Sequence, residues 1–270
     1  MAFSYKKILV VGATSGIGLA LAERFVSNNQ KVIVAGRRKE HLDAFVEKHG
    51  EELASSYVFD VTRLDAIPKF ASEVTKQHPD LDCVFVNSGI QRGFDFSKPE
   101  SVDLDVLGME FTTNYLACIH LTTAFLPHLQ AQQSDTCLMY TTSGLALVPI
   151  TRCANYCASK AAMHHWLLCL REQLKGGPGN VKVVELFPPL VDTELHDEKH
   201  QPDLKDVSLK GMPLEEYTDR TWAALQEGDD QIPVGMPEQA FNTFEKQRQV
   251  VFKQIVDMSA QMFKKDGSAL

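Results

Sequence analysis

The sequence predicts an α/β fold in which one parallel sheet is covered by helices on both faces. Short runs of β-branched and other apolar residues alternate with longer amphipathic stretches, which is the pattern of repeated strand–helix–strand units. The 270 residues, 44% hydrophobic and 23% charged, suit a globular protein with a sizeable core. No Pro-, Ser- or Gly-rich linker divides the chain. We therefore expect a single domain over residues 1–270.

The residues of each segment predict its structure. The apolar runs at 7–11, 31–35 and 56–60 predict three strands, and the helical spacing of apolar residues at 16–28 and 38–49 predicts the helices that connect them. The same alternation continues with helices at 64–78, 102–132 and 155–174 and strands at 83–87, 136–141 and 181–186.

The segment after the last of these strands has a different character. Residues 194–212 lack a regular period and predict an irregular insertion, whereas 237–263 have the spacing of a long amphipathic helix. One side of that helix collects apolar residues, namely Phe241, Phe244, Val251, Ile255, Met258 and Met262. This side is suited to closing over a substrate or to packing on a neighbouring subunit.

Charge and composition exclude several classes of protein. A net charge of -8, from 27 basic and 35 acidic residues, opposes nucleic-acid and anionic-membrane binding. The apolar stretch that follows Lys7 is too short for a signal peptide or a membrane span. Six cysteines without C-x-x-C spacing indicate reduced thiols. We expect a cytoplasmic protein without a disulfide framework.

The sequence also contains a segment that is only superficially similar to a zinc motif. Residues 196–200 place His196 and His200 four apart, but Asp197 stands where the H-E-x-x-H motif requires glutamate. We expect no metal site. His164 and His165 are predicted to be packing or surface residues. Cys153 and Cys157 flank Tyr156 and are predicted to be small apolar packing residues, the alternative being that they contact the substrate.

A glycine-rich turn lies directly between the first strand and the first helix. Glycines there allow a pyrophosphate to approach the backbone and the positive end of the helix. A glycine triplet by itself is equally typical of a tight turn, but its position here favours dinucleotide binding, and with the order of elements it predicts a Rossmann-type, doubly wound sheet. The expected cofactor-binding residues of the turn are Gly12, Thr14, Ser15, Gly16, Ile17 and Gly18.

The end of the second strand indicates which dinucleotide binds. NAD-binding proteins usually carry an acidic residue there, which accepts hydrogen bonds from the ribose. In this chain Gly36 takes that place, and Arg37 and Arg38 follow it. Guanidinium groups suit a 2′-phosphate in charge and geometry. These residues favour NADP(H) over the alternative that two arginines merely begin a solvated helix.

Tyr156 and Lys160 are four residues apart on an expected helix, so their side chains share one face. A neighbouring ammonium and an oxidised nicotinamide both favour the phenolate, so we expect the pKa of Tyr156 to lie below its usual value. The phenol could then act as a general acid and base. Ser143, at the end of an expected strand, is placed to hold the substrate oxygen. Without the upstream serine and the glycine turn, a Tyr-x-x-x-Lys pair on a helix is usually a pair of surface residues without a catalytic role.

These motifs, in this order, closely resemble those of the short-chain dehydrogenase/reductase family, in its NADP(H)-preferring branch. The resemblance spans nearly the whole chain. It implies that Lys160 also binds the nicotinamide ribose and that Asn114 keeps a water that relays protons towards solvent. It further implies cofactor contacts by Asp60, Val61, Asn87, Gly89, Pro188, Val191 and Thr193.

The chain departs from the family pattern at two places beside the cofactor. The usual Asn-Asn-Ala-Gly is Val86-Asn87-Ser88-Gly89 here, so one side-chain contact is lost although the glycine remains. The usual Pro-Gly is Pro188-Pro189, which removes an amide donor and restricts the backbone.

The resemblance implies an NADP(H)-dependent oxidoreductase that interconverts a ketone or aldehyde and its alcohol by hydride transfer. The expected pocket segments, 94–96, 145–153 and 194–212, are apolar in character and suggest a fairly hydrophobic small-molecule substrate. A dinucleotide-using epimerase or dehydratase and a non-catalytic NADP(H)-sensing protein remain as alternatives.

The helix at 155–174 bears on assembly because it is apolar nearly all round. One of its faces should therefore pack against something beyond its own sheet. By resemblance we expect a homodimer or homotetramer that pairs this helix across a two-fold axis. The alternative is that the protein's own C-terminal helix covers it.

Overall fold

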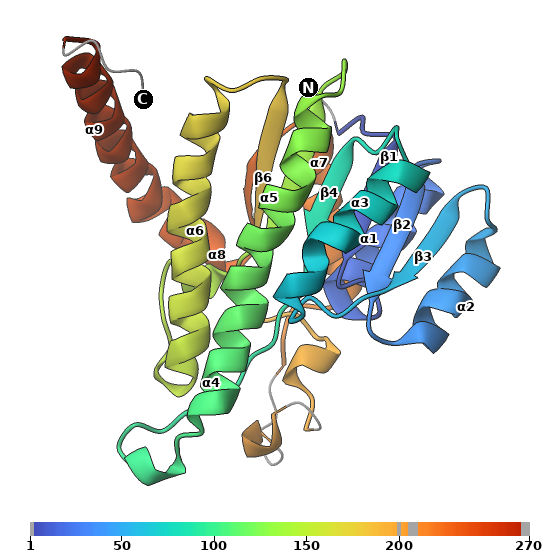
Figure 1. The fold of residues 1–270 in the computed structure, drawn as a ribbon. Helices are drawn as coiled ribbons and strands as arrows, with labels where there is room; N and C mark the ends of the chain where they lie inside the picture. Colours follow the sequence, from blue (N-terminus) through green and yellow to red (C-terminus); the bar gives the residue numbers. More distant parts are fainter. Residues whose placement is uncertain (1–2, 199–200, 205–209, 266–270) are drawn as a thin grey trace.

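In the computed structural model, which describes residues 3–198, 201–204 and 210–265, a sheet of seven parallel strands forms the centre of the molecule (Figure 1). The strands lie in the order β3-β2-β1-β4-β5-β6-β7, which is the doubly wound Rossmann arrangement. The predicted fold class is confirmed. The strands are β1 (Lys7–Val11), β2 (Lys31–Gly36), β3 (Ala54–Val58), β4 (Cys83–Val86), β5 (Thr136–Thr141), β6 (Val181–Phe187) and β7 (Gln231–Pro233).

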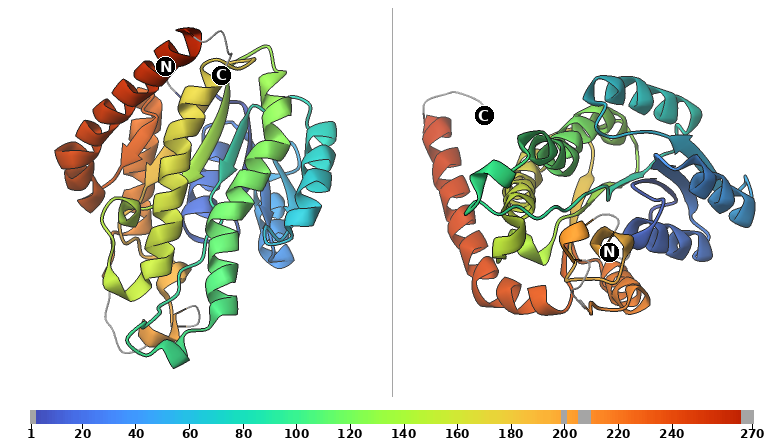
Figure 2. Two further views of the ribbon diagram at one scale, coloured as in Figure 1. Left: turned by 60° about the vertical axis from the view of Figure 1, so that its left-hand side comes forward. Right: turned by 90° about the horizontal axis from the view of Figure 1, so that it is seen from below.

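Helices cover both faces of the sheet (Figures 1 and 2). Along β1, Ile8 and Val10 belong to one core and Leu9 and Val11 to the other, because successive side chains of a strand point to opposite faces. Burial on both faces explains why the strands are continuous apolar runs. On the first face lie α1 (Gly16–Ser27), α2 (Lys39–His49) and α7 (Leu214–Glu227), and on the second α3 (Ile67–Gln77), α5 (Ala117–Gln130) and α6 (Ala154–Leu174).

Most element boundaries lie within one or two residues of those expected. The third strand is shifted to Ala54–Val58 because its partner β2 ends at Gly36, which pairs with Val58. Asp60 therefore lies in the following loop. The expected helix at 102–132 is divided into α4 (Leu104–Phe111), a π-helical turn (Thr112–Leu116) and α5.

Two elements were not expected from the sequence. The first is α7, whose buried Tyr217 and Leu225 pack against the core beside α1. The second is β7, which is only three residues long and extends the sheet beside β6. The spacing of apolar residues before Gly228, which ends α7 in a left-handed conformation, is the signal that could have revealed the helix. A strand as short as β7 offers no such period.

The C-terminal helical segment comprises α8 (Met236–Ala240), a π-helical turn (Phe241–Glu245) and α9 (Lys246–Lys265). The helix expected at 237–263 is therefore present. Phe241 is buried against Phe187, with ring centroids 5.5 Å apart, but α9 then projects from the body (Figure 1). No helix in the described ranges is long and apolar enough to cross a membrane.

Candidate active site

The loops that follow the parallel strands surround a cavity of about 1040 Å³. Its walls come from the residues after β1, β2, β3, β4, β5 and β6, so it lies at the carboxyl edge of the sheet, where doubly wound folds bind ligands. Most of the expected site residues line this cavity. Gly18 and Asn114 do not line the cavity; they support the residues that do.

The glycine turn is shaped by close backbone contacts. Gly12 has a φ of +90°, and a Cβ atom there would lie 2.6 Å from the backbone nitrogen of Ser88. A Cβ atom on Gly18 would lie 2.2 Å from the carbonyl oxygen of Gly12. Gly18 therefore permits the turn to close on α1, whereas Gly12, Thr14, Ser15, Gly16 and Ile17 face the cavity.

Arg38 lies over the first turn of α1. Its Nη2 donates to the hydroxyl oxygens of Thr14 at 2.9 Å and Ser15 at 2.6 Å. Its Nη1 donates to Glu194, at the start of the substrate insertion, at 2.7 Å. Arg37 lines the same part of the cavity. The arginines, the two hydroxyls and the helix N-terminus together form a site suited to a phosphate group.

The expected adenosine side also lines the cavity. Asp60 accepts hydrogen bonds from the backbone and hydroxyl of Thr62, which shapes the loop after β3. Asn87 donates to the carbonyl oxygen of Gly12 at 3.0 Å and accepts from the hydroxyl of Thr141 at 2.8 Å. This amide therefore connects the ends of three strands. Val61 and Gly89 complete the wall.

At the other end, Ser143, Tyr156 and Lys160 meet in the cavity wall. Lys160 is buried, and its Nζ donates to the carbonyl oxygen of Thr141 at 2.8 Å and lies 5.7 Å from the centre of the Tyr156 ring. Ser143 follows β5 directly, and its Oγ accepts from the backbone of Leu145 at 3.1 Å. The end of β5 and one face of α6 thus bring the three side chains together.

Burial dominates the acid–base chemistry of this group. It raises the pKa of Tyr156 above the usual value for a phenol, and a hydrogen bond with Ser143 only partly opposes the effect. It lowers the pKa of Lys160 to about 8. The pKa of Tyr156 thus differs from the expected lowering, because desolvation is the largest influence. At neutral pH the phenol is protonated, while Lys160 remains largely charged.

Asn114 lies in the π-helical turn between α4 and α5 and is fully buried. Its side chain accepts from the backbone nitrogen of Ile90 at 2.9 Å and donates to the carbonyl oxygen of Ile90 at 2.9 Å and to Ser159 at 3.1 Å. It therefore holds the loop after β4 against α6. The π-turn, a frequent feature of functional sites, turns this amide inward.

The segment after β6 lines the cavity through Pro188, Val191 and Thr193. The carbonyl oxygen of Pro188 accepts from the backbone of Gly144 at 2.9 Å, which links this loop to the one that carries Ser143. Val191 forms an isolated parallel bridge with Met212 and so closes the insertion at its base. The second proline, Pro189, also faces the cavity.

The substrate end differs from the expectation. Phe94 and Phe96 do not line the cavity, and Phe96 is 57% exposed, because the chain turns outward after Gly93. Gln91, Arg92 and Met109 take their place, beside Leu145, Ile150 and Arg152. The sequence reasoning missed Gln91 and Arg92. Their position just after Gly89, at the carboxyl end of β4, was the available signal.

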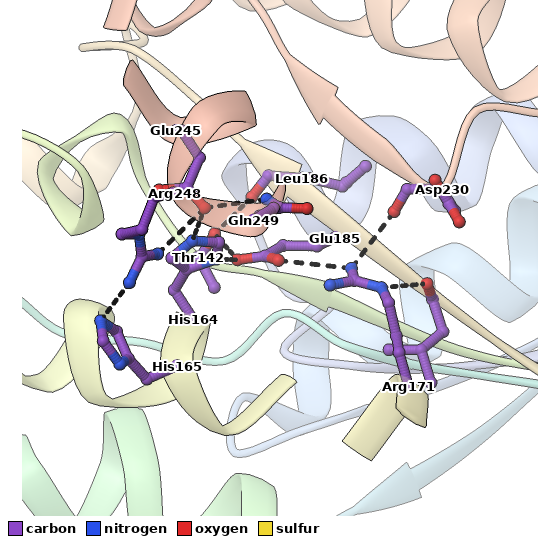
Figure 3. A network of polar contacts seen from close by, with 11 residues as sticks. Thr142, His164, His165, Arg171, Glu185, Leu186, Asp230, Glu245, Arg248 and Gln249 are labelled. Atoms are coloured by element: carbon purple, nitrogen blue, oxygen red, sulfur yellow. Dashed lines mark hydrogen bonds and ion pairs between the residues drawn. The ribbon is translucent and has the colours of Figure 1, made fainter. Parts of the chain in front are cut away.

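A buried network of charges contacts Thr142, the residue before Ser143 (Figure 3). The two ring nitrogens of His164 lie 2.8 Å from Glu185 and 3.0 Å from Glu245, and Glu185 also accepts from the hydroxyl of Thr142 at 3.0 Å. Burial alone would lower the pKa of His164, but the two carboxylates outweigh that and raise it to about 9. The prediction that His164 merely packs or lies at the surface is wrong, because the carboxylates come from distant segments. His165 is exposed.

The remaining reactive groups are the thiols and the candidate metal segment at 196–200. All six cysteines are free, and Cys153 and Cys157 pack around Tyr156 in a small apolar cluster. Within residues 3–198, 201–204 and 210–265 no three His, Cys, Asp or Glu side chains are grouped to hold a metal ion. His200 lies outside these ranges.

A doubly wound sheet with a glycine-rich turn after its first strand and a Ser–Tyr–Lys group at its carboxyl edge is the arrangement of a dinucleotide-dependent oxidoreductase. Residues 6–203 match the family model described as short chain dehydrogenase. The oxidoreductase DltE of Bacillus subtilis is 34% identical over 86% of this chain and 89% of its own length. The NADP-dependent 3-hydroxy acid dehydrogenase YdfG of Salmonella typhimurium is 32% identical over 80% of this chain and 87% of its own. The protein belongs to the short-chain dehydrogenase/reductase family.

Solved structures show the same fold at lower identity. A short-chain dehydrogenase from Sphingobium yanoikuyae in complex with NADPH has a TM-score of 0.78 at 20% identity, with 92% of this chain and 95% of that one covered. One from Burkholderia cenocepacia in complex with NADP has a TM-score of 0.75 at 24% identity, covering 94% and 98%.

Proposed function

We propose that the protein is an NADP(H)-dependent oxidoreductase that interconverts a carbonyl compound and its alcohol. The observation that carries this proposal is the meeting of Ser143, Tyr156 and Lys160 at one end of a cavity whose other end holds Arg37 and Arg38. An acid–base group and a phosphate site in one cavity suit hydride transfer to or from a dinucleotide. A protein that only binds the dinucleotide would need the phosphate site but not the acid–base group.

The residues present fit NADP(H). Gly12 lets the turn pack closely against the loop after β4, where a Cβ atom would lie 2.6 Å from the backbone nitrogen of Ser88, and Arg38 is held beside the N-terminus of α1 by Thr14 and Ser15. A 2′-phosphate would gain charged hydrogen bonds from Arg37 and Arg38 that the ribose of NAD cannot make. The NADP and NADPH in the solved relatives support this choice.

The chain's own residues would handle the proton. When bound, NADPH supplies a hydride to the carbonyl carbon, and NADP⁺ takes it back in the oxidative direction. Ser143 donates a hydrogen bond to the substrate oxygen, and Tyr156 gives that oxygen its proton, so that hydride and proton together complete the alcohol. Lys160, fixed by the carbonyl oxygen of Thr141, stabilises the resulting phenolate and binds the nicotinamide ribose. Asn114 supports the path by which Tyr156 regains a proton.

The substrate is a carbonyl compound with an apolar portion. Leu145, Ile150, Leu195 and Leu204 line the cavity around the catalytic end and would cover that portion. Reduced thiols throughout are compatible with the reducing cytoplasm, where we place the protein.

The test is NADPH absorbance with a panel of ketones and aldehydes, run beside NADH. We expect consumption of NADPH and little of NADH. Tyr156→Phe should abolish turnover and leave NADPH binding intact, because the proton donor is lost while the phosphate contacts remain. Tyr57→Phe, which removes a hydroxyl at the far edge strand, is the matched control. Product formation without net NADPH change would indicate an epimerase or dehydratase instead.

We also propose that the protein is a homo-oligomer and that α9 takes part in the assembly. Exposed apolar residues on α9 and the turn before it follow the heptad spacing of a helix that pairs with another helix. They are Phe244, Val251, Ile255, Met258 and Met262, with exposures from 40% at Phe244 to 62% at Met262. A second copy of the chain would present the same face across a two-fold axis.

A further inference from the structure

We infer that the substrate carries a carboxylate, which is bound by Arg152 and Gln91 at the substrate end of the cavity. The inference rests on the proposed function, since it names the chemical class of compound that the same site would reduce or oxidise.

Arg152 is placed to reach a group attached to the reacting carbonyl compound. It lies in the short 3-10 turn Thr151–Cys153 directly before α6, one helical turn ahead of Tyr156, and both residues line the cavity. Its Nη1 lies 2.5 Å from Oδ2 of Asp203, in the substrate insertion. The guanidinium thus already contacts a carboxylate, the partner that its planar geometry suits best.

Gln91 supplies a second donor. Its Oε1 accepts from Nη2 of Arg152 at 3.2 Å and from the amide of Gln201 at 3.0 Å. Because a guanidinium can only donate, these contacts determine which end of the Gln91 amide is oxygen. The amide nitrogen has no hydrogen-bond partner within the described residues, although the side chain is only 3% exposed and lines the cavity. A ligand oxygen would satisfy this donor.

The surroundings leave room for an anion beside the guanidinium. A Cβ atom on Gly93 would lie 2.6 Å from Oδ2 of Asp203 and 3.1 Å from Nη1 of Arg152, so the absence of a side chain there allows a carboxylate, now that of Asp203, to sit beside the guanidinium. Arg92 adds a second guanidinium to this end of the cavity. His196 adds no charge at neutral pH, because burial lowers its pKa.

Asp203 is a partner that a substrate can replace. The side chains of Arg152 and Asp203 are 30% and 44% exposed, and an ion pair of that exposure contributes little net free energy. A substrate carboxylate would exchange with Asp203 on Arg152 and would also engage Gln91. Leu145 and Ile150, which line the cavity together with Arg152 and Tyr156, would cover the carbon chain that connects the carboxylate to the carbonyl.

The experiment compares keto acids of increasing chain length with their methyl esters, using NADPH and the full-length protein. We expect kcat/KM for the best acid to exceed that for its ester by at least about tenfold, the effect of a hydrogen bond to a charged group. Arg152→Gln should reduce the acid-to-ester ratio to about one, chiefly through a higher KM for the acid. Asp203→Asn should lower the KM for the acid, because it removes the competing carboxylate.

Controls separate charge recognition from folding and from the proposed function. Arg63→Gln removes an exposed guanidinium that pairs with Asp65 and should leave the ratio unchanged. NADPH titration and thermal unfolding show whether Arg152→Gln is folded, and the opposite shift in Asp203→Asn does not depend on that variant. Esters that react as well as acids, or an unchanged acid-to-ester ratio in Arg152→Gln, would overturn the inference. The proposed oxidoreductase function would still hold.

A binding measurement covers the case in which no compound consumes NADPH, which would contradict the proposed function. Calorimetric titration of the NADP⁺-loaded protein with the same acids and esters then decides the inference independently. Binding of acids but not esters, lost in Arg152→Gln, supports it. Equal binding of both, or none, overturns it.

Discussion

Single residues in the site owe their chemistry mainly to burial. Tyr156 and Lys160 are 6% and 3% exposed, so both lose hydration that would stabilise their charged forms. The phenol is therefore hard to ionise and the ammonium easier to neutralise. For a carbonyl reduction this is favourable, since the donor must start protonated.

This environment predicts opposite pH profiles for the two directions. The pKa of Tyr156 is raised, so reduction, which needs the phenol, should be retained at neutral pH, while oxidation, which needs the phenolate, should increase with pH. Steady-state kcat/KM in both directions, from about pH 6 to about pH 10, checks this. Oxidation that is flat or falls over this range would contradict the assignment of Tyr156.

Arg38 should decide the preference for NADPH. Replacing it with Gln removes a charged donor to the 2′-phosphate, so we expect NADPH to bind about 10- to 100-fold more weakly and NADH binding to change little. Fluorescence titration with both cofactors measures the difference. Lys39→Gln, which neutralises an exposed neighbour paired with Asp43, is the control. An equal loss for both cofactors would indicate that Arg38 only supports the fold.

At the scale of elements, the charge network joins α6, β6 and the C-terminal helical segment. Both nitrogens of His164 face carboxylate oxygens, which only accept, so the ring must be doubly protonated to satisfy both contacts. Arg171 donates a hydrogen bond to Glu185, and Arg248 donates one to Glu245. Through Thr142 the network also supports the residue next to Ser143. The base of α9 is thereby connected to the loop after β5, which carries Thr142 and Ser143.

Replacing His164 with Gln should lower the free energy of unfolding by about 3–5 kcal/mol, because two buried carboxylates would face each other without the cation between them. The contribution depends on pH. The pKa of His164 is raised to about 9, so its stabilisation is complete below about pH 6.5, its unfolded value, and is lost as pH rises through about 9.

Urea denaturation at several pH values measures both effects. The difference between wild type and His164→Gln should shrink towards alkaline pH. His165→Gln, at the exposed neighbour, should cost little. If the two variants were equally stable, or if the difference were independent of pH, the imidazolium would not be the connecting charge.

At the scale of the whole molecule, α9 projects from the body formed by the sheet and its covering helices (Figures 1 and 2). Phe252 and Val256 are half-buried, whereas Val251, Ile255 and Met258 are exposed. Glu245, directly before α9, contacts His164 and so connects the base of the helix to α6. A projecting helix with a solvent-facing apolar side is unfavourable in a monomer and suits an oligomer.

Ile255→Lys combined with Met258→Lys should therefore shift the protein to a smaller assembly. Light scattering coupled to size-exclusion chromatography measures the mass, and thermal unfolding shows that the body remains folded. Gln261→Lys places the same charge on α9 outside the apolar face and should leave the mass unchanged. An assembly that survives the double substitution would exclude α9 from the interface and direct attention to α6.

Much of the fold and the site could be predicted because the relevant signals are local. Alternating apolar runs, the turn at 12–18 and the four-residue spacing of Tyr156 and Lys160 each lie within one or two elements. The choice of NADP(H) from Arg37 and Arg38 agrees with the cofactor named for the 32% identical relative YdfG. The short β7, the outward turn that removes Phe94 and Phe96 from the pocket and the raised pKa of Tyr156 depend on packing and were not predictable in this way.

The sequence by itself determined the class of fold, and it predicted the dinucleotide turn and the acid–base pair, because hydrophobic period and motif spacing act over short stretches of chain. Only the tertiary structure decided that Arg152 meets Gln91 and Asp203 at the substrate end, and that His164 lies between Glu185 and Glu245. These contacts join segments 21 to 81 residues apart, and neither spacing nor composition relates residues over such separations. Local pattern thus predicts the class of enzyme, whereas the substrate depends on which distant loops converge.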